Sequence, residues 1–529
     1  MFNFTKNKEV QQQEFKPLFY INPRPQVADI PEIKEKEKID VKYVLIEPYV
    51  YAHIFWDKEN NELIYNIEEP ILDEKEAGIL NLLENSINEL INISFIGMKS
   101  TDVVIEYLEK NLRVLLSEFK INITKESFLK LMYYIYRDFV GLNEFEPLLR
   151  DYYIEDIECN GVNSPVYIVH RKYRNVRTNV IFRDIRKLTS FVEKIAQKCG
   201  KYISYASPLL DASLPDGSRV NATYTQDIST KGPAITIRKF TSEPWSPVKL
   251  MQFKTVSPEM LAYLWLAIEH ESNIMVIGGT GSGKTSLLNS IAFFIPPASR
   301  VVTIEDTREL NILHENWLPG VTRSGVGASN LLGTKEGEIS LFDLLRESFR
   351  QRPDYIIVGE IRGKEAYVLF QGMSSGHPSF GTMHAEDVET MVRRLETPPI
   401  ELSASLIESL DIVCIIGPAK VNNKEVRRVK KVVEIVRVRG GTEGVETNSP
   451  FVWDPRNDNF YFKEESKVFD KIVIHKGISK EKLFREFVLR TKLLVALYKN
   501  NIMEFKEVND LINAYYKTPE AVLKKFNIS

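Results

Sequence analysis

The sequence predicts an α/β protein in which a parallel sheet in the C-terminal half is preceded by smaller α+β domains. Between about residues 250 and 420, short and wholly apolar runs alternate with helical patterns, which is the order of buried parallel strands joined by helices. One such run leads into a glycine-rich loop and a further helical pattern. Upstream, strand and helix patterns follow one another less regularly. A chain of 529 residues is too long for one hydrophobic core, so we expect several domains.

The composition argues against several classes of protein. There are 69 basic and 72 acidic residues, a net charge of 69 − 72 = −3, so no overall charge favours nucleic acid and we expect none as a partner. The cysteines Cys159, Cys199 and Cys414 stand far apart and indicate buried thiols rather than a zinc site or disulfides. Neither a membrane-length apolar run nor a signal peptide is apparent, so we expect a cytoplasmic protein that reaches a membrane only through a partner.

We expect five segments along the chain. Residues 1–40 are polar and aperiodic and predict a mobile arm. Residues 41–113 predict an α+β module with strands at 43–46, 50–56 and 63–67, and residues 114–240 predict a second module. A proline-containing linker covers 241–252, and the α/β domain covers 253–529. His53, within the second strand, is interpreted as a packed aromatic residue rather than as a ligand.

The glycine-rich loop matches the pattern G-x-x-x-x-G-K-[ST] at every fixed position, after a predicted strand at 273–277 and before a predicted helix at 286–292. Glycine lets the backbone aim its N–H groups at a phosphate chain, and the helix N-terminus favours negative charge. We expect Lys284 to reach the β- and γ-phosphates and Thr285 to ligate Mg²⁺, so that the cofactors are ATP and Mg²⁺. The predicted nucleotide-binding residues are Gly278, Gly279, Thr280, Gly281, Ser282, Gly283, Lys284 and Thr285.

Two of the apolar runs end in acidic residues that suit the chemistry of a bound nucleotide. The run 355–358 is followed by Gly359 and Glu360, so glycine stands where a magnesium-binding aspartate is usual. The run 301–304 is followed by Glu305 and Asp306, and we expect these residues to supply the missing carboxylate. The predicted catalytic residues are then Lys284, Glu305 and Glu360, and the predicted metal ligands are Thr285, Glu305, Asp306 and Glu360.

Two histidines follow, His377 and His384, seven residues apart on a strand-and-turn pattern. A histidine can donate a hydrogen bond to a γ-phosphate or to a carboxylate. We assign His384 to the catalytic set and His377 to nucleotide binding. A hydrogen-bonded core position suits either residue as well, and the pattern does not decide which one contacts the nucleotide.

The set of motifs resembles the secretion ATPase superfamily, which drives type II secretion, type IV pili and the archaeal archaellum. The phosphate loop, the acidic box at 304–306, the Gly-Glu box at 358–360 and the histidine box at 376–385 stand in the order of that family. The segments 154–157, 160–161, 215–221 and 236–240 resemble its N-terminal module, so the resemblance spans about 145–420. Segments 342–346 and 350–355 look most like archaeal members. The tetracysteine zinc module of many bacterial type II members is missing from this sequence.

The resemblance implies a RecA-like motor domain over 253–529, a PAS-like module over 114–240 and assembly into a homohexamer. It also implies that Arg219 and Arg238 act as catalytic residues, brought to the nucleotide as the cleft between 145–240 and the motor domain closes. The implied partners are a polytopic membrane platform protein and, indirectly, the pilin-like subunits of a pilus, archaellum or type II secretion system. The alternatives are a type IV secretion motor that translocates DNA or protein, and a scaffold that binds ATP without turnover.

Overall fold

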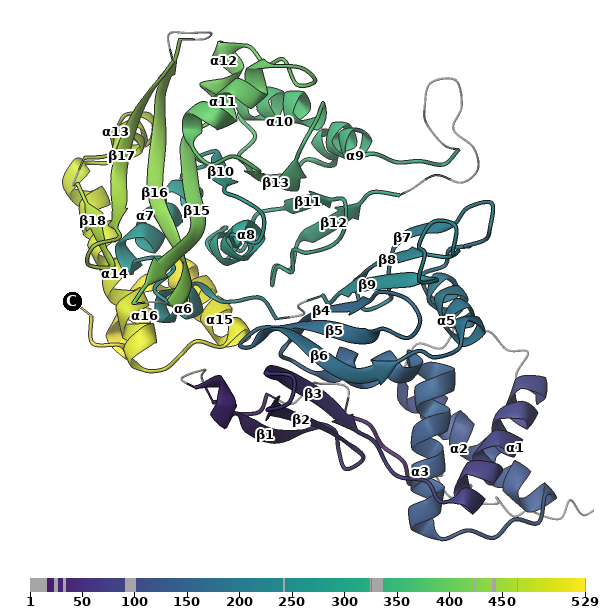
Figure 1. The fold of residues 1–529 in the computed structure, drawn as a ribbon. Coiled ribbons are helices and arrows are strands. Elements are labelled where there is room, and N and C mark those ends of the chain that lie inside the picture. Colours follow the sequence, from purple (N-terminus) through teal and green to yellow (C-terminus); the bar gives the residue numbers. More distant parts are fainter. Residues whose placement is uncertain are drawn as a thin grey trace, which may run out of the picture. The chain divides into compact units, whose positions relative to one another are not determined.

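A computed structural model describes residues 17–22, 27–31, 35–90, 101–240, 243–323, 325, 336–422, 424–439, 444–463 and 465–528. The chain divides into two compact units, residues 1–240 and 241–529. Figure 1 shows the helices and strands of both units.

The first unit is built on one nine-stranded sheet with the order β1-β2-β3-β6-β5-β4-β9-β8-β7. Neighbouring strands are antiparallel except for the parallel pair of β3 and β6, which joins the early strands to the later ones. The division near residue 113 falls inside helix α2, and the predicted separation into two modules stays a prediction. The strands are β1 (Asp40–Ile46), β2 (Val50–Asp57), β3 (Glu62–Glu68), β4 (Ile154–Cys159), β5 (Pro165–His170), β6 (Arg174–Ile181), β7 (Leu209–Ser213), β8 (Arg219–Thr223) and β9 (Ala234–Arg238).

In the sequence, the α-helices of this unit lie between β3 and β4 and between β6 and β7. Residues Asp73 and Glu76 form the reciprocal cap of α1, with Glu76 N donating to Asp73 Oδ1 at 2.7 Å and Asp73 N to Glu76 Oε2 at 3.0 Å. Helix α3 (Lys125–Ile135) continues directly as a π-helical turn, η3 (Tyr136–Val140). The helices are α1 (Glu74–Leu90), α2 (Thr101–Glu118), α3 (Lys125–Ile135), α4 (Glu146–Arg150) and α5 (Ile185–Lys198).

Part of the segment predicted to be a mobile arm packs into the first unit. Phe19, Ile21 and Ile30 are buried in the hydrophobic core of the first unit. The carboxylate of Glu109, itself fully buried, accepts the backbone N–H groups of Leu18 at 2.8 Å and Phe19 at 3.1 Å. This packing could not be predicted from the sequence, because single apolar residues between polar ones show neither the helical nor the strand period. Residues 1–16 lie outside the described residues.

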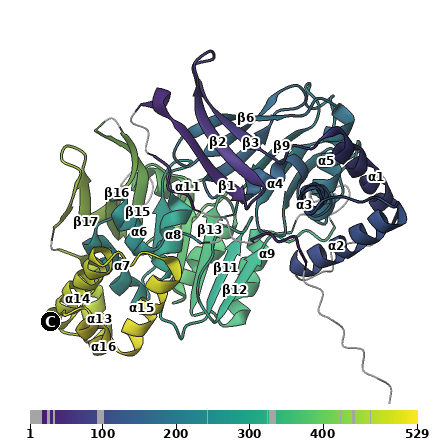
Figure 2. The same ribbon diagram turned by 90° about the horizontal axis from the view of Figure 1, so that it is seen from below.

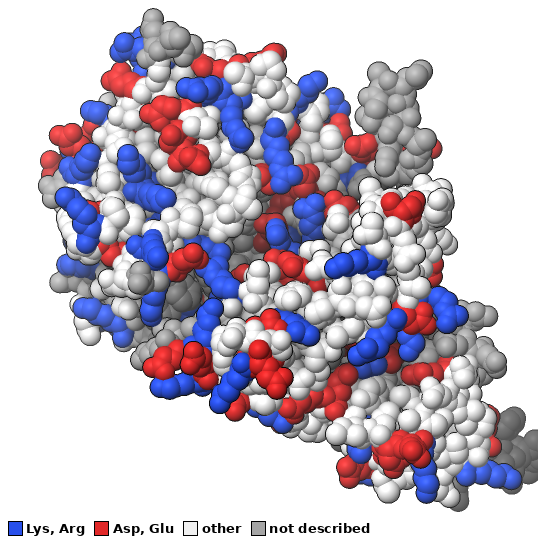
Figure 3. Space-filling view, viewed as in Figure 1, with Lys and Arg blue, Asp and Glu red and all other residues white. Residues whose placement is uncertain are grey.

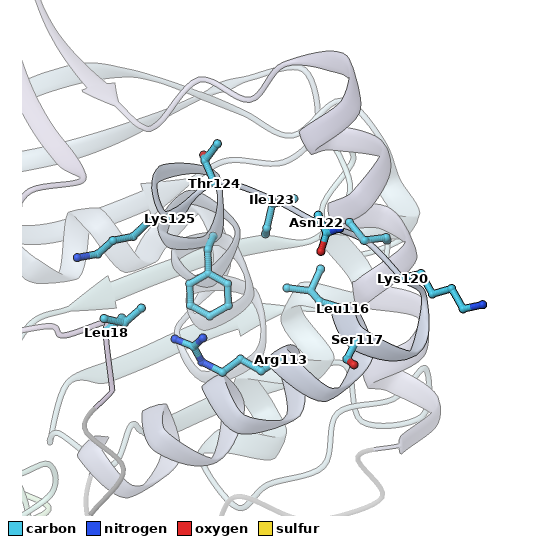
Figure 4. A pocket seen from close by; sticks show the side chains of 11 residues that line it. Leu18, Arg113, Leu116, Ser117, Lys120, Asn122, Ile123, Thr124 and Lys125 are labelled. Carbon is cyan, nitrogen blue, oxygen red and sulfur yellow. The ribbon is translucent and has the colours of Figure 1, made fainter.

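A pocket of about 600 Å³ lies between α2, α3 and the connection joining them (Figure 4). Leu18, Leu116 and Phe128 are among its lining residues. Lys120 and Lys125 stand at its border, and their side chains extend away from it. These two ammonium groups therefore bring no converging charge to the pocket.

His53 is a packed aromatic residue only in part. Its ring centroid lies 4.9 Å from that of Phe55, as the sequence interpretation expects. Its two nitrogens also lie beside carboxylates, with Nε2 2.8 Å from Asp40 Oδ1 and Nδ1 3.2 Å from Glu68 Oε1. The sequence pattern of β2 gave no sign of these cross-strand partners.

The second unit holds the predicted parallel sheet, extended by antiparallel strands. Its order is β12-β11-β13-β14-β10-β15-β16-β17-β18, with parallel pairing from β12 to β15 and antiparallel pairing beyond. The antiparallel extension was not predicted from the sequence. The strands are β10 (Ile274–Ile277), β11 (Val301–Glu305), β12 (Trp317–Val321), β13 (Tyr355–Ile361), β14 (Ser379–Met383), β15 (Ile412–Val421), β16 (Lys424–Val438), β17 (Val445–Asp454) and β18 (Asn459–Phe462).

Helices cover both faces of this sheet, each with its own hydrophobic core. One core contains α6 (Pro247–Gln252), α7 (Pro258–Glu269), α8 (Lys284–Ala292) and the C-terminal helices, and α14 packs against α7 (Figures 1 and 2). The other core contains α9 (Leu341–Ser348), α10 (Glu365–Ser374), α11 (Val388–Glu396) and α12 (Ala404–Ile407). The C-terminal helices are α13 (Lys467–Lys476), α14 (Lys480–Lys499), α15 (Phe505–Lys517) and α16 (Pro519–Lys525).

The predicted linker, residues 241–252, contains helix α6. Pro247 occupies its first turn, where a missing N–H costs nothing, and Ser246 caps it by accepting from Lys249 N at 3.2 Å. Among the described helices, none is both long and apolar enough to cross a lipid bilayer. Acidic and basic side chains are interspersed over the face seen in Figure 3.

Candidate functional site

The glycine-rich loop lies between the end of β10 at Ile277 and the start of α8 at Lys284. Gly281 and Gly283 have positive φ angles, 66° and 99°, a conformation that glycine adopts without strain. A Cβ on Gly278 would lie 2.1 Å from the carbonyl oxygen of Ile416, so the neighbouring strand β15 leaves no room for a side chain. Two conformational demands and one steric demand thus explain these glycines of the motif.

The ammonium group of Lys284 is held inside this loop. It donates to the carbonyl oxygens of Gly278 at 3.1 Å and Gly279 at 2.8 Å, and it lies 3.4 Å from Nδ1 of His384. Burial lowers the pKa of Lys284, while the nearby carboxylates of Glu360 and Glu309 act in the opposite direction. The loop therefore positions one cation at the N-terminus of α8.

His384 connects this cation to Glu360. Its Nδ1 faces the Lys284 ammonium, and its Nε2 lies 3.1 Å from Oε1 of Glu360. Because an ammonium group can only donate, Nδ1 must accept and Nε2 must carry the proton. Burial lowers the pKa of His384, and the charge of Lys284 lowers it further. The structure thus brings together Lys284, His384 and Glu360, three of the residues predicted to be catalytic, and their catalytic role stays a prediction.

Glu360 lies within β13 and not beyond its end. The strand continues to Ile361, and the Arg362 guanidinium pairs with Oε2 of Glu360. The apolar run in the sequence covers only residues 355–358, and glycine and glutamate are poor strand formers. Pairing with β14, where Ile361 lies opposite Met383, extends it.

Glu305 is placed differently from the expectation. It is buried at the end of β11, and its Oε1 accepts the backbone N–H groups of Glu309 at 2.9 Å and Leu310 at 2.8 Å. Burial raises the pKa of Glu305 to about 7, although these two hydrogen bonds lower it. Its Oε2 is buried and makes no hydrogen bond with the described residues. Glu305 therefore shapes the loop that follows it.

Glu309, three residues beyond Asp306, is an acidic residue that contacts Thr285, one of the predicted metal ligands. The hydroxyl group of Thr285 donates to Oε2 of Glu309 at 2.9 Å. The Asp306 side chain is exposed, and its backbone carbonyl accepts from Thr322 Oγ1. Glu309 was not predicted from the sequence, because it lies beyond the end of the strand and only the turn after Glu305 carries it back to the phosphate loop. An acidic residue four positions beyond Glu305 was the available signal.

His377 lies at the amino ends of the parallel strands, whereas the phosphate loop lies at their carboxyl ends. It precedes β14, whereas His384 follows it, and β14 runs parallel to β10, whose carboxyl end leads into the loop. The His377 ring packs edge-on against Phe349 with centroids 5.1 Å apart. The structure therefore does not bring His377 to the phosphate loop, because a strand separates the two histidines.

Arg219 and Arg238 belong to the first unit, where they lie opposite each other on strands β8 and β9. Arg219 Nη2 lies 3.1 Å from Asp211 Oδ2, and Arg238 Nε lies 3.1 Å from Asp156 Oδ1. Two like charges facing each other across strands repel, and each aspartate offsets one of them. The structure therefore gathers two arginines at one position of the sheet, with both side chains at least partly exposed.

The second unit has the strand–loop–helix of a P-loop protein on a RecA-like α/β sheet, with the first unit preceding it. The chain belongs to the family described as Type II/IV secretion system protein, which residues 142–443 match.

Three individual proteins are similar to this chain. The uncharacterized protein MJ0900 of Methanocaldococcus jannaschii is 34% identical over 529 residues, covering 96% of this chain and 94% of the relative. The type IV secretion system protein PtlH of Bordetella pertussis is 31% identical over 257 residues, covering 42% of this chain and 73% of the relative. The structure of the Legionella pneumophila ATPase DotB is 17% identical, with a TM-score of 0.41, and the match covers 72% of this chain and 96% of that one.

Proposed function

We propose that this protein is a Mg²⁺-dependent ATPase that powers a secretion or filament-assembly machine. The observation that supports hydrolysis most directly is the chain of contacts from Lys284 through His384 to Glu360. It connects the cation expected at the β- and γ-phosphates with a carboxylate suited to orient an attacking water. A scaffold that only binds ATP has no need of this carboxylate.

The residues beside Lys284 fit a magnesium ion. Mg²⁺ prefers oxygen ligands and keeps several waters, and the Thr285 hydroxyl and the Glu309 carboxylate lie 2.9 Å apart at the start of α8. We propose that Thr285 ligates the ion and that Glu309 holds it directly or through water. The ion would neutralise charge on the phosphates. Glu305, turned toward the backbone of its own loop, orients Glu309.

The arginines of the first unit complete the proposal. Arg219 and Arg238 would close over the γ-phosphate in a homohexamer, and the motion of the 145–240 module would act on a polytopic membrane platform. Membership of the secretion family supports this reading. The platform would assemble pilin-like subunits into a pilus or archaellum, or drive type II secretion. A type IV secretion motor is the second candidate, favoured by the similarity to PtlH.

The test of the enzyme is the ATPase rate of the full chain with Mg²⁺, with excess chelator, and in the Lys284→Ala variant. Hydrolysis should need the metal, and Lys284→Ala should retain less than about a tenth of the rate with an unchanged circular dichroism spectrum. Hydrolysis by Lys284→Ala at the wild-type rate would remove the phosphate loop from the mechanism.

The machine is tested separately. Light scattering with a slowly hydrolysed ATP analogue should give the mass of a hexamer, and a monomer under all conditions would contradict the assembly. Cross-linking in membranes of the source cell should capture a polytopic protein with pilin-like subunits if a filament is served. Recovery of DNA or a translocated protein instead would favour the type IV reading.

A further inference from the structure

Strand β16 carries a bulge where it passes the phosphate loop. The pairing of β15 with β16 matches Ile415 with Lys431 but Ile416 with Val429, so Lys430 has no partner. An extra residue of this kind shifts the alternation of side chains by one position. Bulges are common beside functional sites because they redirect a side chain.

The bulge brings Arg427 to the face of the sheet that α8 covers. Ile416 and Val429, which pair directly, belong to the same hydrophobic core as Leu287 and Leu288 of α8. Arg427 lies two residues before Val429 and therefore faces the same way. Without the bulge, Arg428 and not Arg427 would point to the face that α8 covers.

Arg427 reaches the last glycine of the loop. A Cβ on Gly283 would lie 3.5 Å from Cδ of Arg427 and 3.5 Å from Cδ1 of Ile416. The guanidinium group of Arg427 therefore begins next to Gly283, the residue before Lys284. Its side chain is half-buried.

The neighbouring residue, Arg428, differs from Arg427 because it is paired within the protein. Arg428 is almost fully buried and makes a two-pronged pair with Asp458 at 2.8 and 3.0 Å, and it also donates to Phe253 O at 3.0 Å. For the Arg427 guanidinium, the described residues provide no such ion pair or hydrogen bond. A half-buried guanidinium without a protein partner is a ready site for an anionic ligand.

We propose that Arg427 contacts the α- and β-phosphates of the nucleotide, an inference that rests on the proposed ATPase function. The backbone of a phosphate loop holds the α- and β-phosphates, while its lysine reaches the β- and γ-phosphates. An arginine beside Gly283 is therefore at the end of the phosphate chain that ADP and ATP share. Its planar group can donate to two phosphate oxygens at once.

The experiment is calorimetric titration of the full-length protein with ADP and with a slowly hydrolysed ATP analogue. Arg427→Gln should weaken both affinities by the same factor, about ten- to a hundredfold for the loss of a hydrogen bond to a charged group. Arg427→Lys should fall in between, because it keeps the charge but not the fork. Arg437→Gln, an exposed arginine ten residues further along β16, should bind as the wild type does.

Wild-type affinity for ADP in both Arg427 variants would overturn the inference. So would a loss confined to the ATP analogue, because that places the contact at the γ-phosphate. If Arg427→Gln does not fold, Arg427→Lys carries the test, with a severalfold loss for both nucleotides as the expected result. A wild-type protein that binds neither nucleotide would instead remove the proposed function.

Discussion

A Cβ on Gly359 would lie 3.0 Å from Cγ of Glu305 and 3.5 Å from its Oε1. The two residues follow a directly paired position on neighbouring parallel strands, where Ile304 of β11 lies opposite Val358 of β13. The Glu305 side chain therefore occupies the space that an aspartate at position 359 would need. Glycine in this box is a packing requirement as well as the loss of a carboxylate.

Gly359→Ala should consequently destabilise the second unit by about 1–3 kcal/mol, the usual cost of adding a methyl group to a packed site. The same substitution should cost much less in a Glu305→Ala background, because the contact is then gone. Denaturant unfolding of the four proteins in this cycle measures the coupling. Gly78→Ala in α1, where no atom lies within 4 Å of the new Cβ, is the matched control and should be neutral or slightly stabilising. Equal costs of Gly359→Ala in both backgrounds would show that Glu305 does not fill this space.

The raised pKa of Glu305 predicts a pH dependence of stability. A carboxyl group with a pKa of about 7 in the folded state, against an ordinary pKa of 4.5, binds its proton more tightly in the folded state. Between these pH values the folded state therefore holds more protons than the unfolded state, and the stability falls as the pH rises. The contribution lost by about pH 7 is on the order of 2–3 kcal/mol.

Glu305→Gln should remove this dependence. The difference in unfolding temperature, variant minus wild type, should increase as the pH is raised from 4.5 to 7. Above pH 7 the difference should stay constant. Thermal unfolding without nucleotide, followed in matched buffers, measures the difference. Parallel pH curves for the two proteins would mean that Glu305 is already ionised in the folded state at low pH.

The carboxylates should separate in their effects on turnover. Glu360→Gln should lower kcat about a hundredfold or more, the loss expected on removing a general base, with nucleotide affinity little changed. Glu309→Gln should raise the Mg²⁺ concentration for half-maximal rate by about ten- to a hundredfold. Glu315→Gln provides the control and should leave the metal requirement near the wild-type value, because this exposed residue precedes β12, at the end of the parallel strands opposite the phosphate loop. A normal metal requirement in Glu309→Gln would leave Thr285 without its proposed partner.

Arg219→Ala and Arg238→Ala should each lower the ATPase rate about ten- to a hundredfold, if each loses a charge-assisted hydrogen bond to the γ-phosphate. Lysine should rescue poorly, since it cannot bridge two phosphate oxygens. Affinity for ADP, which has no γ-phosphate, should stay the same. Arg186→Ala on α5, where the side chain is exposed, serves as the control. Wild-type rates in both alanine variants would exclude the first unit from the catalytic site.

The phosphate loop and the strands before the acidic boxes were predictable because each depends on local sequence. The loop has fixed spacing, and four apolar residues in a row suit a strand that is buried on both faces. The antiparallel strands β16 to β18 were missed because their charged residues interrupt the apolar pattern, as in the run from Arg427 to Lys431. Pairing with β15 holds that stretch in the sheet.

The division of roles between Glu305 and Glu309 was not predictable from one sequence. Both are acidic and both follow a buried strand, and only the turn between them decides which carboxylate contacts Thr285. The same holds for the histidines, where the direction of β14 separates His377 from His384. Side-chain roles at a strand end depend on contacts with other parts of the fold, which sequence spacing does not contain.

Removing the segment around Phe19 would take away contacts that belong to the core of the first unit. A chain that begins at β1 would lack the N–H groups of Leu18 and Phe19 that reach the buried carboxylate of Glu109. Arg113, 2.7 Å away, would remain as a charged partner for that carboxylate. The shortened protein would have an unfilled space where Phe19 packs and a buried carboxylate at Glu109 that has lost two hydrogen bonds. Its solubility and unfolding temperature would therefore not represent those of the full chain.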